Sequence, residues 1–140
     1  MKTLILYYSY SGKTKAIAEK LAAEKSADLA EIKDVKRPGT LKAYLSGCPA
    51  ALKGKAWPIQ MLDVDMAGYD QLYLLSPVWA GNPPPAVNAV LEKLPKGKAV
   101  AVTMVSASGG SKCRERVEAA IAAKECTLAG WEDVRGSKKE

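Results

Sequence analysis

The chain has 140 residues, of which 48% are hydrophobic and 26% are charged, a composition typical of one folded domain rather than of a disordered chain. Its 21 Lys and Arg residues outnumber its 15 Asp and Glu residues, but they form no basic tail or arginine-rich stripe, so nucleic-acid binding is not indicated. Histidine is absent, which excludes Ser-His-Asp and Cys-His catalysis and zinc held by histidine. If this protein carries out chemistry, we expect a cofactor to supply it.

The cysteines and the apolar segments indicate the compartment. Cys48, Cys113 and Cys126 are odd in number and form no C-x-x-C pair, so neither a disulfide framework nor a metal knuckle is indicated. No segment approaches the roughly 20 apolar residues of a membrane span, and the first apolar run is too short for a signal peptide. We expect a cytoplasmic protein that does not associate with a membrane.

The first elements in chain order are a strand, a helix and a second strand. Residues 3–8 are apolar in one block, which indicates a strand buried on both faces, and the turn residues 9–12 end it. A helical pattern follows over residues 13–25. A weaker strand with polar alternation is expected over residues 29–35, at a sheet edge.

A second helix is predicted after the turn at residues 37–39, with Thr40 as its cap. This helix would carry three apolar side chains on one side: Leu41, Tyr44 and Leu45. Pro49 must interrupt it, because proline lacks the backbone N–H that a helix interior requires. Residues 53–68 are expected to be irregular.

The second half of the chain repeats the alternation of strands and helices. In chain order it contains a strand at 71–76, a helix after the proline run 83–85, a strand at 99–105, a helix at 112–124 and a strand at 127–131. Strands alternating with helices predict one α/β domain over residues 1–140, with helices on both faces of a doubly wound parallel sheet. Such folds bind ligands at the carboxyl ends of the strands, where three unusual loops follow the first, third and fourth strands.

The first of these loops, residues 9–14, joins a strand to a helix and is dense in hydroxyl groups. The unpaired N–H groups of a helix N-terminus favour a phosphate there, although an N-cap and a tight turn would explain one hydroxyl and the glycine. A nucleoside-triphosphate loop is excluded, because Tyr7 stands where its first glycine is required. A G-x-G-x-x-G dinucleotide loop is also missing. The ligand that remains is a phosphomonoester.

The other two loops suit a flat ring. Trp79 stands in a loop flanked by Gly81 and Pro83, where an indole can stack on a planar ligand or fold back over the helix below it. The loop over residues 106–110 offers small residues and backbone amides to the edge of a heterocycle, and it would serve equally as a plain turn.

These three loops resemble those of the flavodoxin-like FMN-binding superfamily, and the resemblance covers nearly the whole chain in order and spacing. It implies a three-layer flavodoxin-like fold with a parallel sheet of order 2-1-3-4-5 and FMN as cofactor. In that family the first loop holds the phosphate, here Ser9, Tyr10, Ser11, Gly12, Lys13 and Thr14. The second loop would line one side of the isoalloxazine with Pro77, Val78, Trp79, Ala80, Gly81 and Asn82, and the third would line the other side with Ser106, Ala107, Ser108 and Gly109.

Three features depart from the electron-carrier flavodoxins. The third loop has no aromatic residue, so one flavin face would be open to a substrate or a neighbouring chain. The net charge is +6, whereas many electron-carrier flavodoxins are strongly acidic. A positive charge favours the reduced, anionic form of the flavin. The family's fifth helix is missing after Trp131, which would leave Val100, Val102 or Met104 exposed and predicts a homodimer through that sheet face.

Three functions remain open from the sequence. The first is transfer of electrons to or from a redox partner protein through bound FMN, for which no side chain need be a general acid or base. The second is an NAD(P)H-dependent FMN or quinone reductase, which rapid anaerobic bleaching of the flavin by NAD(P)H would identify. The third is a cofactor-free interaction module with a degenerate flavin site, which FMN affinity would test.

Overall fold

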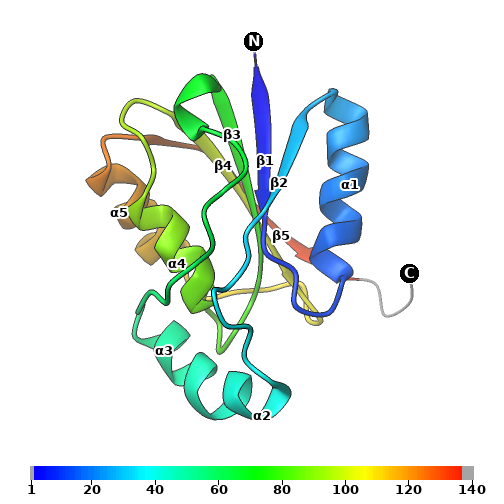
Figure 1. Ribbon diagram of the computed structural model, residues 1–140, viewed down its shortest axis with the longest axis vertical. Helices are drawn as coiled ribbons and strands as arrows, with labels where there is room; N and C mark the ends of the chain where they lie inside the picture. The colour runs from blue at the N-terminus through cyan, green and yellow to red at the C-terminus, as the bar shows by residue number, and fades with distance from the viewer. Residues whose placement is uncertain (1, 137–140) are drawn as a thin grey trace.

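Five parallel strands form one sheet of order β2-β1-β3-β4-β5 in the computed structural model, which describes residues 2–136 (Figure 1). The strands are β1 (Thr3–Tyr7), β2 (Asp28–Glu31), β3 (Gln71–Pro77), β4 (Ala99–Ser106) and β5 (Thr127–Arg135). Every neighbouring pair is parallel, so the carboxyl ends of all five strands lie at one edge of the sheet. The predicted strand order is confirmed.

The helices divide between the two faces of the sheet. The longer ones are α1 (Lys13–Lys25), α4 (Pro85–Glu92) and α5 (Arg114–Ala123). Figure 1 shows α1 alone on one face and α4 with α5 on the other, as the predicted three-layer arrangement requires. Among residues 2–136, no helix is long and apolar enough to cross a membrane.

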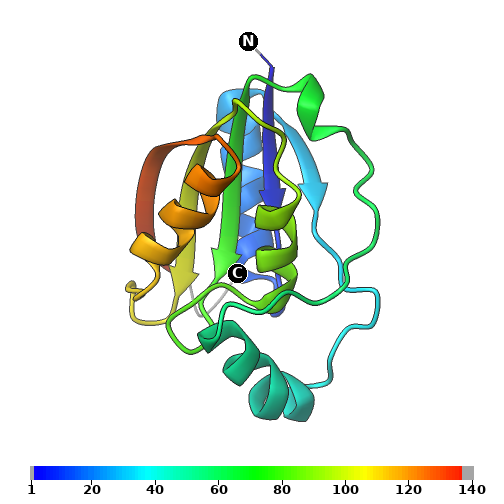
Figure 2. The same cartoon turned by 90° about the vertical axis from the view of Figure 1, so that its left-hand side faces the viewer.

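A further helical segment lies beyond the carboxyl ends of the strands, on the side of α4 (Figure 2). It runs without a break through α2 (Thr40–Lys42), the π-helical turn η1 (Ala43–Gly47) and α3 (Cys48–Leu52). A short 3-10 turn, η2 (Met66–Gly68), precedes β3.

The strand β1 is buried on both faces, as its apolar block predicted. Leu4 and Leu6 pack into the larger core with α4 and α5, and Ile5 and Tyr7 pack against α1 in the smaller one. Because side chains alternate along a strand, a sheet covered on both faces requires an apolar residue at every position. Residues 4–7 of β1 meet that requirement.

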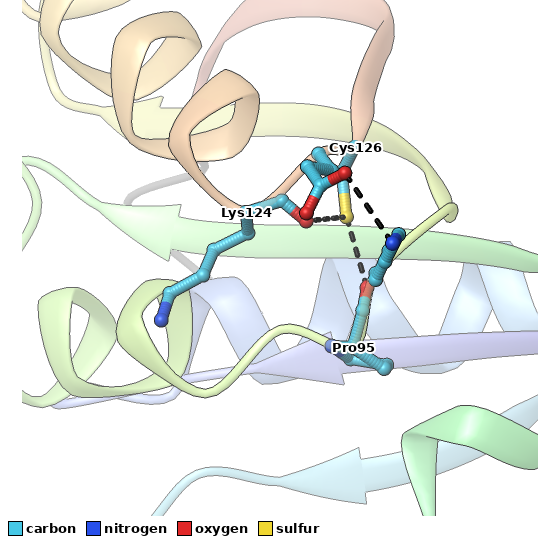
Figure 3. Close-up of polar contacts among 5 residues, drawn as sticks. Pro95, Lys124 and Cys126 are labelled. Atoms are coloured by element: carbon cyan, nitrogen blue, oxygen red, sulfur yellow. Dashed lines mark hydrogen bonds and ion pairs between the residues drawn. The ribbon is translucent and has the colours of Figure 1, made fainter.

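All three cysteines are free thiols, and one of them joins two connections of the sheet. The Cys126 thiol, just before β5, donates a hydrogen bond to the carbonyl oxygen of Pro95 at 3.0 Å (Figure 3). The Gly97 N–H donates to the Glu125 carbonyl oxygen, also at 3.0 Å. The connection from α4 to β4 is thereby fastened to the one from α5 to β5.

Two expectations for the first half of the chain are corrected. The second strand is only Asp28–Glu31, and the rest of the predicted range leaves the sheet, with Asp34 forming an isolated antiparallel bridge to Ile59. Pro49 does not interrupt the second helix, because it falls in the first turn of α3 directly after η1. In η1 the Cys48 N–H donates to the carbonyl oxygen five residues back, at Ala43, so the helix widens and continues past the proline.

The expected exposure of β4 is also wrong. Val100, Val102 and Met104 are buried in the core beneath α4 and α5, because the residues of β4 that face the α1 side are the alternate ones. On that side Thr103 and Val105 are buried as well. The last strand extends to Arg135, four residues beyond the prediction. The predicted homodimer therefore has no support from those three side chains and stays a prediction.

Candidate functional site

The three loops singled out in the sequence meet at the carboxyl edge of the sheet. The Tyr10 ring of the first loop contacts the Trp79 ring of the second, with centroids 5.6 Å apart. The Lys112 N–H, just beyond the third loop, donates to the Gly81 carbonyl oxygen at 2.9 Å. The fold thus brings all three loops into one continuous surface.

The first loop leaves backbone donors at the start of α1. The Ser9 hydroxyl oxygen accepts hydrogen bonds from the N–H groups of Gly12 at 3.0 Å and Lys15 at 3.2 Å. Ser9 therefore caps the start of the helix, which is the alternative to phosphate binding that the sequence left open for one hydroxyl of this loop. The N–H groups of Ser11, Lys13 and Thr14 donate to no acceptor within residues 2–136. Unpaired donors in the first turn of a helix, together with the positive end of its dipole, favour an anion.

Gly12 sets the shape of this loop. Its φ of 100° lies in a region that residues with a Cβ rarely adopt, and nothing lies within 4 Å of the position a Cβ would take. The backbone turns sharply into α1 at this point. The amides on both sides of the glycine are thereby exposed together.

Tyr10 fastens the first loop to the turn after β2. Its hydroxyl donates to the Pro38 carbonyl oxygen at 2.9 Å, and Arg37 donates from Nη2 to the Tyr10 carbonyl oxygen at 2.6 Å. The Arg37 guanidinium also lies 4.3 Å from the centroid of the Tyr10 ring. Both contacts place a permanent cation beside the first loop.

A buried hydrogen bond supports the base of the first loop. The Tyr8 hydroxyl donates to Asp34 Oδ2 at 2.6 Å. Burial raises the pKa of the Asp34 carboxyl, and the hydrogen bond from Tyr8 and the charge of Arg37 oppose that rise without cancelling it. Burial also raises the pKa of the Tyr8 hydroxyl, and the hydrogen bond and charge of Asp34 raise it further.

The second loop is a tight turn between Trp79 and Asn82. The Trp79 N–H donates to the Asn82 carbonyl oxygen at 2.7 Å, and the Asn82 N–H donates back to the Trp79 carbonyl oxygen at 3.0 Å. The two central residues have positive φ values, 52° at Ala80 and 81° at Gly81, as in a type I′ turn. An alanine in this conformation is strained by about 1 kcal/mol, so the surroundings of the loop must enforce it.

Asn82 and Arg116 supply that enforcement. The Asn82 amide donates from Nδ2 to the Ala80 carbonyl oxygen at 3.0 Å, which closes the turn a second time. Arg116 on α5 donates from Nη1 to Asn82 Oδ1 at 3.2 Å and to the Leu52 carbonyl oxygen at 2.7 Å. One guanidinium therefore ties the second loop to the end of α3.

The Trp79 indole lies between the first loop and the π-helical turn η1. It meets the rings of Tyr8 and Tyr10 edge to face, at interplanar angles of 75° and 84°. On η1 a Cβ built on Gly47 would lie 2.6 Å from Trp79 Cζ3, so the ring rests directly on this glycine. The indole thus covers η1, which is one of the two roles expected for it, and its stacking on a planar ligand stays a prediction.

The third loop is closed by its own serine. The Ser106 hydroxyl oxygen accepts from the N–H groups of Gly109 at 2.8 Å and Gly110 at 3.0 Å, and Arg135 donates from Nε to the Ala107 carbonyl oxygen at 2.9 Å. Ala107 and Ser108 are exposed at its tip. Their N–H groups donate to no acceptor in the described part of the chain, which leaves them available to the edge of a ligand.

Three residues that fix the loops from outside carry no recognisable sequence pattern: Asp34, Arg37 and Gly47. The sequence pattern places Asp34 in an expected strand and Arg37 in a turn, and it gives Gly47 no role. No spacing in the sequence connects these residues with the loops, because their contacts form only when the segment after β2 folds across the carboxyl edge of the sheet. The one signal in the sequence is the acidic Asp34 close to the basic residues Lys36 and Arg37.

Several solved structures that resemble this chain are flavoproteins. A flavoprotein from Lactobacillus acidophilus, solved in complex with FMN, is 30% identical to this chain, with 96% of this chain and 93% of that one covered and a TM-score of 0.75. A protein from Bacteroides uniformis superposes with a TM-score of 0.79 at 22% identity, and flavodoxin 2 from Bacillus cereus with 0.57 at 20% identity, which show the fold alone. These alignments cover 99% and 100% of this chain, and 92% and 88% of the neighbours.

A sequence relative and the family models complete the comparison. An uncharacterized protein from Archaeoglobus fulgidus is 30% identical over 115 residues, covering 81% of this chain and 70% of that protein. No family model matches the chain. The sheet order and the three loops define an α/β protein of the flavodoxin-like fold. With 30% identity across nearly all of the Lactobacillus protein, the chain belongs to the flavodoxin-like flavoprotein family.

The contact between Gly47 and Trp79 can be tested by adding a methyl group. Gly47→Ala forces the indole to move, because the new Cβ would lie 2.6 Å from one ring carbon and 3.1 Å from another. We expect a loss of about 1–3 kcal/mol in unfolding free energy, as for other overpacked sites, and a shifted tryptophan emission maximum. Gly39→Ala is the matched control, since nothing lies within 4 Å of its Cβ position. Equal stability and unchanged emission in both variants would contradict the packing.

The burial of Asp34 predicts a dependence of stability on pH. Because the folded protein holds the Asp34 proton above the ordinary pKa of 3.8, stability conferred by this group is lost as the pH rises from 3.8 through the raised value. Asp34→Asn removes that titration. Across this pH range, the unfolding free energy of the variant, measured by urea titration, should therefore rise relative to that of the unsubstituted protein. Asp63→Asn removes an exposed carboxyl as the control. Parallel pH profiles for Asp34→Asn and the unsubstituted protein would contradict the argument.

Proposed function

We propose that this protein binds FMN non-covalently across its three loops and transfers electrons through it. The observation that carries the proposal is the start of α1, where the N–H groups of Ser11, Lys13 and Thr14 lack acceptors in the described chain beside the cation of Arg37. Donors of this kind fit a phosphate dianion. The FMN complex of the Lactobacillus relative supports the same ligand.

The ligand contacts are assigned loop by loop. The phosphate would be held by the first loop: Ser9, Tyr10, Ser11, Gly12, Lys13 and Thr14. The ring would lie between the second loop, Pro77, Val78, Trp79, Ala80, Gly81 and Asn82, and the third, Ser106, Ala107, Ser108 and Gly109. The contacts of Trp79 with Tyr8 and Tyr10 support the second assignment, because they hold the indole rigid beside the first loop.

FMN, when bound, supplies the redox chemistry, and the residues of this chain supply position and electrostatics. The donors of the first loop bind the phosphate and fix the depth of the ligand. Trp79 excludes water from one side of the ring. The N–H groups of Ala107 and Ser108 are placed to donate to its polar edge, and the net charge of +6 favours a reduced, anionic ring.

The role proposed is that of an electron carrier in the cytoplasm that works with a redox partner protein. An NAD(P)H-dependent reductase is the second candidate, favoured by the third loop, whose exposed tip of Ala107 and Ser108 places no aromatic ring over the flavin. Anaerobic bleaching by NAD(P)H separates the two. Sedimentation velocity tests the homodimer, which stays part of the proposal.

Removal of two hydroxyls tests the phosphate site. The double variant Ser11→Ala, Thr14→Ala should bind FMN at least about tenfold more weakly, because hydrogen bonds to charged groups contribute about 1.5–3 kcal/mol each. Its affinity for riboflavin, which lacks the phosphate, should change less than about twofold. Fluorescence quenching titrations of the apo-protein measure both affinities.

A matched control uses the same two substitutions elsewhere. Thr40→Ala with Ser46→Ala removes two exposed hydroxyls from α2 and η1, and FMN affinity should be unchanged. Equal weakening of FMN and riboflavin by the Ser11 and Thr14 changes would show that this loop does not bind the phosphate.

A further inference from the structure

The positive charge of this protein is concentrated in one segment. Residues 35–62 contain five Lys or Arg residues and no Asp or Glu, so this segment carries a charge of +5. The other 112 residues carry a net charge of only +1. The cations of the segment are all exposed: Lys36, Arg37, Lys42, Lys53 and Lys55. A field of this kind attracts an acidic partner and accelerates its association.

The same segment exposes its large apolar side chains. Leu41, Tyr44, Leu45 and Leu52 are 72%, 74%, 67% and 55% exposed. The side of the helical segment that faces the domain is made of small residues instead, among them the buried Ala43, Gly47 and Ala51. The predicted apolar side of this helix is therefore real, but it faces solvent. We call these four side chains and the five cations the apolar-basic face.

A hollow within this face suits an acidic side chain. It has a volume of about 250 Å³ and is lined by Asp34, Val35, Lys36, Lys42, Trp57 and Pro58. The Lys42 ammonium lies 5.7 Å from the centroid of the Trp57 ring. The carboxylate of Asp34 is engaged by the Tyr8 hydroxyl, which leaves the two lysines to a ligand. An aromatic wall with two ammonium groups fits a carboxylate carried by another protein.

The apolar-basic face and the candidate flavin site lie on opposite sides of the same helical segment. A Cβ built on Gly47 would lie 2.6 Å from the Trp79 ring and 3.7 Å from the Trp57 ring, so one glycine separates the wall of the site from the wall of the hollow. Arg116 holds this arrangement by donating to the carbonyl oxygens of Ala51 and Leu52 at 3.1 and 2.7 Å. A partner seated on the face would thus lie across this helical segment from Trp79.

We propose that an acidic redox protein docks on the apolar-basic face, with its acidic side chains at the five cations and an apolar contact over Leu41, Tyr44, Leu45 and Leu52. That the partner is a redox protein rests on the proposed function. That the partner is acidic follows from the charge and the apolar side chains of the face, whether or not the proposed function is right. A second copy of this chain is disfavoured as the occupant because it would bring the same cations. The hollow, with a volume of about 250 Å³, has room for a single inserted side chain, which favours a shaped protein surface over a lipid headgroup layer.

The test uses a plant-type [2Fe–2S] ferredoxin as the acidic probe and cytochrome c as a basic probe of similar size. Isothermal titration of the full chain at low ionic strength should show saturable binding of the ferredoxin and none of the cytochrome. Raising the salt to about 0.5 M should weaken ferredoxin binding at least about tenfold, because exposed charges are screened. Failure of the ferredoxin to bind, or equal binding of both probes, would overturn the proposal.

Two pairs of charge reversals locate the contact. Lys42→Glu with Lys53→Glu should weaken ferredoxin binding at least about tenfold, and Lys20→Glu with Lys93→Glu, which makes the same charge change on α1 and beyond α4, less than about threefold. Leu41→Ser with Leu45→Ser should also weaken it about tenfold, and circular dichroism checks that the fold is kept. Equal effects of the two charge pairs would contradict the assignment.

Two alternative occupants are outcomes of the same experiments. A dimer that Leu41→Ser with Leu45→Ser dissociates in sedimentation would assign the face to a second copy of the chain and overturn the proposal. If the protein sediments with phosphatidylserine vesicles and the Leu41→Ser, Leu45→Ser variant does not, the face binds a membrane surface and the proposal is overturned. The titrations are made with both the apo-protein and the FMN-treated protein. Ferredoxin docking without FMN binding would refute the proposed function alone. FMN binding without ferredoxin docking would refute the docking proposal alone.

Discussion

The packing of Trp79 is the interaction on which the rest of the site depends. The indole meets the ring of Tyr8, directly after β1, and the ring of Tyr10 in the first loop, and it rests on Gly47 of the π-helical turn. These contacts join the first loop, the second loop and the segment after β2 into one unit. A side chain larger than hydrogen at position 47 would separate them, so the glycine and the tryptophan constrain one another.

The parallel sheet explains why those parts meet. With order β2-β1-β3-β4-β5, the loops after β1, β3 and β4 leave the same edge of neighbouring strands. The segment after β2 then has to return across that edge to reach β3, and in doing so it carries most of the net positive charge to the rim of the site. The ligand site and the charged surface therefore follow from the same topology.

The sequence predicted the elements that local pattern determines. The apolar block of β1 and the three loops at the strand ends are where the periodicity and turn residues placed them. The predicted break at Pro49 was wrong, because the π-helical turn lets the helix continue past a residue that has no N–H. The predicted exposure of Val102 was wrong, because this residue lies on the opposite face of β4 from the one expected. The apolar stripe of Leu41 and Tyr44 was found, but which side faces solvent depends on tertiary packing that a single helix pattern does not contain.

The most direct test of the account is an amide NMR titration of the apo-protein with FMN, because it reports where the ligand binds as well as whether it does. We expect saturable shifts at the N–H groups of Ser11, Lys13 and Thr14, at the tip of the third loop and at the Trp79 indole. Absence of saturable shifts at those groups, or shifts confined to the large cavity lined by Met61, Leu62 and Lys93, would contradict it.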